Sequence, residues 1–305
     1  MRVLLSTWKP WTKVSISLQQ RIDMAKAARA ELCIKGTNGG SLYGPSTWAI
    51  FLVPPYKGKS NDDLELLCKA QDPSIPVPMW CYIYLSNPHG SADAINRALD
   101  RWNSKDVFFD IEGTSKNYPQ NTGPFLRTLG DSRARYWLQS YRRPDYHPEI
   151  QWEKLLTYKD SNGNYIIHGL SPQAYPLQSQ DFVADFERMI KAYDNLLDKV
   201  DRPDIPWFPT LPTFTQSGWT PTAEAMRDGV DYLANTLGDR LKGLNFWRQY
   251  FLFTPEYADM LAYILSIYPD EPPPEPVIPQ AEYIHGHLHP WAVSEGYDGP
   301  APDTK

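Results

Sequence analysis

The segment "DVFFDIEG" (residues 106–113) is a short apolar run that ends in two carboxylates, Asp110 and Glu112. Side chains alternate along a β-strand, so these two acids face one side while Phe109 and Ile111 face the other. The rise of a strand separates the Cβ atoms of the two acids by roughly 6–7 Å. The segment therefore predicts a strand that is apolar toward covering helices and acidic toward a second surface.

Strand-like and helix-like segments alternate on both sides of this stretch. Eight expected strands are each followed by a segment in which apolar residues recur with helical spacing. The expected strand segments are 2–8, 31–40 (including a glycine-rich turn), 77–87, 106–113, 135–141, 165–176, 205–214 and 243–252. The expected helices are 17–30, 61–71, 91–103, 123–131, 150–158, 181–200, 220–238 and 255–268.

Strands that alternate with helices imply parallel pairing through right-handed crossovers. Eight such units within residues 1–268 match the size and repeat number of a (β/α)8 barrel. A doubly wound open sheet is the rival architecture, but it normally carries a glycine-rich phosphate loop after its first strand. The segment "STWKPW" (6–11) has no such glycines. We therefore predict an α/β fold, a (β/α)8 TIM barrel over residues 1–268.

The composition changes after residue 268. The segment "PDEPPPEPVIPQ" (269–280) is rich in Pro and Glu and predicts an extended, polyproline-like linker. Residues 269–305 are therefore expected to form a Pro-rich linker and C-terminal tail. His285, His287 and His289 alternate in this tail, but without fixed partner ligands they do not predict a metal site.

Charge and composition exclude several classes of function. A formal net charge of -6 argues against a general nucleic-acid-binding protein, which usually presents a basic face. The three cysteines lack zinc-ligand spacing and do not suggest a disulfide scaffold, and we expect no metal and no cofactor. No apolar run approaches the ~20 residues that span a bilayer. The first residues lack a Sec signal peptide, so we expect a soluble protein that is cytoplasmic or released as phage lysins are.

The acid pair is expected at the mouth of the barrel, where active sites of this fold lie. Two carboxylates at such a spacing suit glycosidic bond hydrolysis: one protonates the leaving oxygen while the other acts as nucleophile, base or electrostatic stabiliser. The alternative is structural, with the pair capping the following turn or one acid pairing with an Arg from a neighbouring strand.

Aromatic and amide side chains at the other strand ends favour sugar chemistry. The chain has 11 Trp and 19 Tyr, and the C–H faces of sugar rings pack well on aromatic planes. Amides and phenols can orient sugar hydroxyl groups. The expected substrate-binding residues are Trp8, Lys35, Trp80, Tyr82, Tyr141, Gln173, Tyr175, Trp207, Trp247 and Gln249.

Several of these segments resemble the glycoside hydrolase family 25 lysozymes. "CIKGTNG" (33–39) is similar to that family's Lys-Ala-Thr/Ser-x-Gly segment, and "FFDIE" (108–112) to its Asp-x-Glu strand. "FWRQY" (246–250) is similar to its late Trp-Gln-Tyr strand with one extra residue, and "SPQAYP" (171–176) to strands of related sugar-cleaving barrels. Family 18 chitinases also end their fourth strand in a run of acids, with Phe108 here in place of the first Asp of their longer motif.

The resemblance implies a hydrolase of a β-linked, N-acetylated polysaccharide such as peptidoglycan, with Glu112 as general acid and Asp110 assisting. Leu4 stands where family 25 has a first-strand Asp. This difference supports a second hypothesis, in which the barrel has lost catalysis and binds glycan or serves as a module of a larger assembly. A third is an intracellular barrel enzyme that uses the same acids for unrelated chemistry.

Overall fold

The computed structural model describes residues 2–8, 31–35, 78–102, 104–176, 181–213, 221–247, 260 and 263–264. For residues 2–8 and 31–35 it describes the backbone and not the side chains. The predicted helices 17–30 and 61–71, nearly all of the last helix and the tail 269–305 lie outside these residues.

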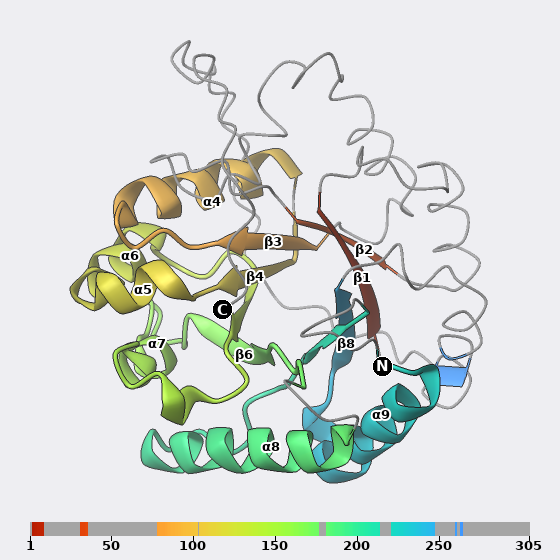
Figure 1. Cartoon of the computed structure of the whole chain (residues 1–305). Helices are drawn as coiled ribbons and strands as arrows, with labels where there is room; N and C mark the ends of the chain where they lie inside the picture. Colours follow the sequence, from red (N-terminus) through yellow and green to blue (C-terminus); the bar gives the residue numbers. More distant parts are fainter. Residues whose placement is uncertain are drawn as a thin grey trace.

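Eight parallel strands form the described sheet (Figure 1). They are β1 (Arg2–Trp8), β2 (Glu31–Lys35), β3 (Met79–Tyr82), β4 (Asp106–Asp110), β5 (Arg135–Ser140), β6 (Ile167–Pro172), β7 (Thr210–Pro212) and β8 (Gly243–Trp247). Their order is β6-β5-β4-β3-β2-β1-β8-β7. Parallel bridges Leu170–Trp207 and Gln173–Thr210 join the two ends of this order, so the sheet closes into a barrel.

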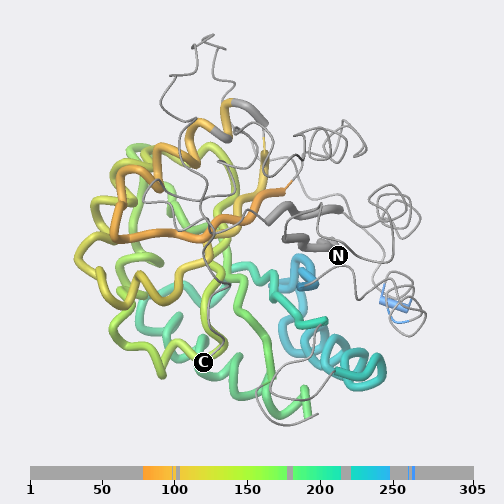
Figure 2. Tube along the Cα trace, turned by 45° about the horizontal axis from the view of Figure 1, so that its top comes forward, coloured from red at the N-terminus to blue at the C-terminus, as the bar shows by residue number. Residues whose placement is uncertain are grey.

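Helices cover the outside of the strands in both Figure 1 and the tilted view of Figure 2. The described helices are α4 (Pro88–Trp102), α5 (Gly113–Asn117), α6 (Thr122–Leu129), α7 (Trp152–Thr157), α8 (Phe182–Lys199) and α9 (Ala223–Leu237). The predicted (β/α)8 TIM barrel is confirmed. Among the described helices, none combines the length and the apolar character that a membrane-crossing segment needs.

The two longest helices after β6 begin at side-chain caps. Asp181 accepts a hydrogen bond from the backbone N–H of Ala184 at 2.9 Å, and Thr222 accepts one from Ala225 at 3.1 Å. Each cap satisfies one of the N–H groups that a helix start leaves without an intrahelical partner. These caps fix where α8 and α9 begin, close to the ends expected from the apolar periodicity.

The outer face of β4 packs under the helices, as the alternation of its side chains predicts. Phe109 and Ile111 are fully buried. The Phe109 ring meets Phe125 of α6 edge to face, with centroids 5.6 Å apart, and stacks on Tyr136 of β5 at 4.8 Å. The other face of β4, which carries Phe108 and Asp110, is therefore turned into the barrel.

A layer of aromatic rings fills the barrel interior. Trp80, Phe108, Trp137 and Phe208 form one buried cluster. Phe108 stacks on Trp137 with centroids 5.9 Å apart and meets Phe208 edge to face at 5.3 Å. Toward the start of β4, Asp106 accepts hydrogen bonds from Trp137 Nε1 at 2.8 Å and from Nε and Nη2 of Arg135. The interior of the barrel is thus a packed core, and the Asp106–Arg135 pair lies at its lower end, where β4 begins.

Gly169 of β6 leaves room for the largest of these rings. It lies in register with Trp137, at a point where the register of β5 and β6 shifts. A Cβ atom on Gly169 would lie 2.4 Å from Trp137 Cζ3 and 2.7 Å from the carbonyl oxygen of Pro206. Such distances are well inside van der Waals contact, so this position admits no side chain while Trp137 occupies the interior.

Two segments differ from the predicted elements. Of the expected strand 205–214 the structure describes residues 205–213, and only Thr210–Pro212 of these form β7, since Pro206 and Pro209 before it cannot donate to a ladder. Pro206 and Pro209 contribute only acceptors, to the N–H groups of Leu170 and Asn245. After β4, α5 and the 3₁₀ helix Pro119–Asn121 were not predicted, because elements this short carry no readable period.

We expect Gly169→Ala to lower the free energy of unfolding by about 1–3 kcal/mol, because one of the two clashes is with backbone that cannot rotate away. Urea denaturation followed by tryptophan fluorescence measures this. Gly123→Ala in α6 is the matched control. Its Cβ would meet only the mobile ends of Lys154 and Arg127, at 3.3–3.4 Å. Equal stability of the two variants would contradict the role assigned to Gly169.

Candidate active site

Asp110 and Glu112 lie at the carboxyl end of β4, where Asp110 is the next inward-facing residue after Phe108 of the aromatic layer. The chain stays in ladder geometry past the strand end, since Ile83 N–H donates to Asp110 O and Ile111 N–H donates to Gln139 O, both at 2.9 Å. Asp110 is buried, with 2% of its surface exposed, whereas Glu112 is only partly buried at the start of α5. Of the two acids, Glu112 is the more accessible to a ligand.

Gln173, at the end of β6, holds both acids with one nitrogen. Its Nε2 lies 3.2 Å from Asp110 Oδ1 and also donates to Glu112 Oε1. A primary amide nitrogen carries two hydrogens, so it can serve both carboxylates at once. Its backbone is fixed in turn, because Gln173 N–H donates to Ser140 O at 2.8 Å. The predicted catalytic pair and the predicted residue Gln173 are thus brought together.

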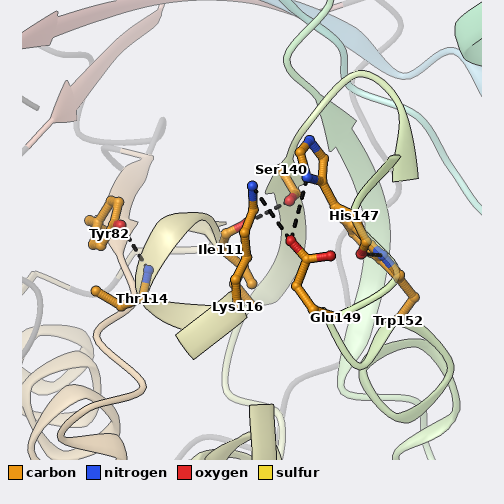
Figure 3. A network of polar contacts seen from close by, with 8 residues as sticks. All are labelled: Tyr82, Ile111, Thr114, Lys116, Ser140, His147, Glu149 and Trp152. Atoms are coloured by element: carbon orange, nitrogen blue, oxygen red, sulfur yellow. Dashed lines mark hydrogen bonds and ion pairs between the residues drawn. The ribbon is translucent and has the colours of Figure 1, made fainter. Parts of the chain in front are cut away.

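Two phenols flank the acids. Tyr82 of β3 is in register with Asp110, and its hydroxyl oxygen accepts the backbone N–H of Thr114 at 3.4 Å (Figure 3). Burial first, and then the charges of Asp110 and Glu112, raise the pKa of Tyr82 to about 12. Burial followed by the charge of Glu112 also raises the pKa of Tyr141. Both phenols are neutral near pH 7, as ordinary tyrosines are, and the upward shifts keep them protonated at more alkaline pH, so they can act as hydrogen-bond donors.

A charged group formed by Lys116, His147 and Glu149 lies around the Tyr141 ring. Lys116 Nζ lies 4.1 Å from the ring centroid, and the His147 ring centroid lies 3.8 Å from it. Glu149 Oε1 lies 3.7 Å from both Lys116 Nζ and His147 Nδ1 (Figure 3). The pKa of His147 is lowered by burial first and then by Lys116, with Glu149 opposing the change. These contacts hold the ring of Tyr141, and the charge of Glu112 acts on its hydroxyl.

This charged group was missed by the sequence analysis. Lys116 lies in the short α5, and His147 and Glu149 lie in the loop that follows β5. Neither segment shows a period, and the three residues are up to 33 positions apart in the chain. Only the spacing of His147 and Glu149 after a strand end offers a signal, and alone it does not distinguish a site from a loop.

Polar side chains lie level with Asp110 around the inside of the barrel. Ser171 and Thr210 hydroxyls are 3.1 Å apart, and Asn245 Nδ2 donates to Thr210 Oγ1 at 3.2 Å. Gln139, in register with both Asp110 and Ser171, is 2% exposed, and its Oε1 has no hydrogen-bond partner among the described residues. The floor of the site is thus polar although the core beneath it is aromatic.

Trp80 and Trp247 stack inside the barrel, with centroids 6.3 Å apart and planes at 13°. Their exposed fractions are 2% and 8%, so Trp247 is the slightly more open of the two. Tyr175 is partly buried and lies two residues beyond Gln173. The structure thus places Trp80 and Trp247 on the inner face with Tyr82, and Trp80 belongs to the buried aromatic layer itself. Their role in substrate binding stays a prediction.

Trp207 corrects one prediction. It is fully buried in the main core, where its ring meets Tyr193 of α8 edge to face at 5.4 Å. It therefore lies between barrel and helices, and its neighbour Phe208 is the residue that points inward. Trp8 and Lys35 end β1 and β2 in register with each other, as expected, but their side chains and Gln249 lie outside the described residues.

Comparison with known proteins shows the fold. No family model and no curated protein sequence matches this chain. Among solved structures, a class V chitinase from Pseudomonas fluorescens Pf-5 superposes with a TM-score of 0.56 at 11% identity, covering 85% of this chain and 98% of that one. A family 18 chitinase from Crocus vernus has a TM-score of 0.51 at 12% identity, with coverage of 87% and 100%.

The spore cortex-lytic enzyme SleL of Bacillus megaterium QM B1551 superposes with a TM-score of 0.52 at 9% identity, covering 85% of this chain and 73% of that one. At such low identity these likenesses establish the architecture alone. The chain is a TIM barrel of the kind that these glycoside hydrolases have. They do not single out family 25, so the lysozyme-like resemblance is not established.

The raised pKa of Tyr82 predicts a pH dependence of stability. Above pH 10 the phenol ionises in the unfolded chain but stays protonated in the fold, so stability falls as the pH rises from about 10 to about 12. Tyr82→Phe removes this group, and we expect the stability of the variant to fall less steeply with pH in that window. The difference between the two slopes corresponds to at most one bound proton per molecule. Denaturant titrations between pH 9 and 12 measure both slopes. Identical slopes would contradict the assignment.

Proposed function

We propose that this barrel hydrolyses a β-linked polysaccharide of N-acetylated sugars, with Glu112 as general acid and Asp110 assisting. The observation that carries the proposal is the pair of carboxylates at the barrel mouth, held by the single amide of Gln173 and flanked by two neutral phenols. The similarity in fold to chitinases and to a spore cortex-lytic enzyme supports the same substrate class.

Accessibility assigns the two roles. A general acid must reach the glycosidic oxygen, and Glu112 is partly exposed whereas Asp110 is 2% exposed. Asp110 lies beneath, where it can accept a hydrogen bond from a substrate amide and hold it in place. The phenols of Tyr82 and Tyr141 are placed to donate to sugar oxygens around the cleaved bond.

The shared donor also limits the geometry of the reaction. Two oxygens that both lie within hydrogen-bond distance of one nitrogen are at most about 6 Å apart. Inverting glycosidases need about 6.5–9.5 Å between carboxyl groups, to fit a water beside the sugar. The two oxygens held by Gln173 therefore leave little room between them for the water of an inverting reaction.

Because Asp110 is buried, the substrate's own acetamido group is the better nucleophile. Glu112 gives its proton to the glycosidic oxygen, and the bond from that oxygen to the anomeric carbon breaks with its electron pair on the leaving sugar. The acetamido carbonyl oxygen bonds to the anomeric carbon while Asp110 holds the amide N–H. Water then attacks the same carbon, the acetamido bond breaks, and the water's proton returns to Glu112.

Peptidoglycan and chitin both belong to this substrate class. A muramidase-like activity on peptidoglycan is the finer form of the proposal, and it follows from the segments that resemble family 25. Chitin oligosaccharides test the broader form. Hydrolysis of cell walls but not of chitin oligosaccharides would support the muramidase-like form.

A catalytically inactive glycan-binding barrel is the second candidate. It is favoured by the composition of the inner faces: the interior positions beside Asp110 and Glu112 carry Gln139, Ser171, Thr210 and Asn245, none of which is a carboxylate. An acid pair already held by Gln173 can bind sugar hydroxyls without transferring a proton. Such a barrel would serve as a glycan-binding or structural module of a larger assembly.

We expect Glu112→Gln to lower kcat about 10²–10⁴-fold on chitin oligosaccharides or cell walls, because the amide cannot donate the proton, while KM changes little. Glu153→Gln, at an exposed acid of α7, is the matched control and should match the wild type. Equal activity of Glu112→Gln and wild type would overturn the acid role. Binding of oligosaccharides by a wild type that cleaves none would favour the second candidate.

Two successive displacements at the anomeric carbon, first by the acetamido oxygen and then by water, predict that a β-linked substrate first releases a β-configured reducing end. Proton NMR of the anomeric signals in the first minutes of hydrolysis distinguishes the β product from the α product before they equilibrate. Initial accumulation of the α anomer would contradict the proposed geometry while leaving hydrolysis itself intact.

A further inference from the structure

Tyr146 is the most exposed large hydrophobic residue in the described part of the chain. Its side chain is 66% exposed, compared with 41% for Tyr118 and 38% for Tyr165. It lies in residues 141–149, the β5 loop, which leaves the carboxyl end of β5 at the mouth of the barrel. Single exposed aromatics are common, so the surroundings of this ring decide whether it is a binding element.

The ring of Tyr146 is held from one side. The Arg143 guanidinium lies 4.3 Å from its centroid, within the range of cation–π attraction. Arg143 is held in turn by Asp145, through Nε to Oδ1 at 2.8 Å and through a second bond from Nη2 to Oδ2. The guanidinium therefore covers part of the ring, and the large exposed remainder forms a platform of fixed orientation.

The backbone below the platform is also constrained. Pro144 begins the 3₁₀ helix Pro144–Tyr146, and Tyr146 N–H donates to Arg143 O at 3.2 Å. Arg142 pairs with the buried Asp185 of α8 at 2.9 Å, and Tyr193 of α8 donates its hydroxyl to Tyr141 O at 2.7 Å. A ring fixed before binding loses little entropy when a ligand packs on it.

The β5 loop connects this platform to the acid pair. It starts at Tyr141, whose phenol senses the charge of Glu112, and continues through His147, which packs on the Tyr141 ring. A linear glycan bound across the acids can therefore continue along the loop. Its flat C–H faces match an aromatic platform that offers no unpaired charge, since Arg143 is neutralised by Asp145.

We propose that Tyr146 forms an outer sugar-binding subsite, which packs on a pyranose ring of the same glycan chain beyond the units that contact Asp110 and Glu112. This inference rests on the proposed function. It makes the protein selective for long chains, because only an oligosaccharide that spans from the acids to Tyr146 gains the additional contact.

Tyr165 provides a matched control. It is also an exposed tyrosine with cations on its ring, with Arg202 at 4.0 Å and Lys159 at 4.6 Å. It precedes β6, however, and therefore lies at the end of the barrel opposite the acids. Both tyrosines are exposed and carry a cation on the ring, although Tyr165 is the less exposed of the two, and they lie at opposite ends of the barrel.

The experiment measures binding of chitin oligosaccharides from two to eight units by isothermal calorimetry, in a Glu112→Gln background that prevents cleavage. We expect the affinity to rise with chain length, and Tyr146→Ala to weaken binding of the longest chains by about three- to tenfold while leaving the shortest unchanged. Tyr146→Phe keeps the ring and should behave as the unsubstituted background, as should Tyr165→Ala.

Equal loss at all chain lengths, or no loss at any length, would overturn the inference while the proposed function stands. An equal effect of Tyr165→Ala would also overturn it, because the contact would then not depend on the mouth. If the Glu112→Gln background binds no oligosaccharide and the wild type cleaves none, the proposed function fails first and the subsite fails with it.

Discussion

The packing of Trp137 against the bare backbone of Gly169 is the constraint on which the barrel interior depends. The Trp137 ring stacks on Phe108 and meets Phe208 edge to face, and its indole nitrogen is held by Asp106. Four aromatic rings can share this space only because β6 contributes no side chain at Gly169. The resulting aromatic layer is closely packed, and the acid pair at the mouth of the barrel lies above it.

The two carboxylates above this aromatic layer need hydrogen-bond donors to offset their mutual repulsion. Two carboxylates on adjacent inward positions repel each other, and burial removes the water that would screen them. The amide of Gln173, delivered from β6, supplies a donor to both. The phenols of Tyr82 and Tyr141 are neutral at pH 7, and burial and the negative charges raise their pKa values further, so the site gains donors without gaining further charge.

The parts of the fold and the site in which apolar side chains recur at regular spacing could be predicted. The parts that depend on which face of a short strand a residue occupies could not. The inner and outer faces of β4 were assigned correctly, because side chains alternate along its five residues and only one assignment fits them. In "PWFP" (206–209), two aromatics stand side by side between prolines, and either could point inward. The structure turns Phe208 into the barrel and Trp207 into the main core. The group around Tyr141 depends on α5 and the β5 loop, which have no period at all.

The sequence by itself determined the succession of eight strands and the presence of two acids on one face of β4. Those features are local: they need only the alternation of side chains along a strand and the apolar stripe of a helix. The tertiary structure decided which residues meet across the barrel. Gln173 reaches Asp110 across 63 positions of sequence, and Tyr82 is brought beside the same acid from β3. Such contacts are set by the closure and register of the sheet, which no single segment encodes.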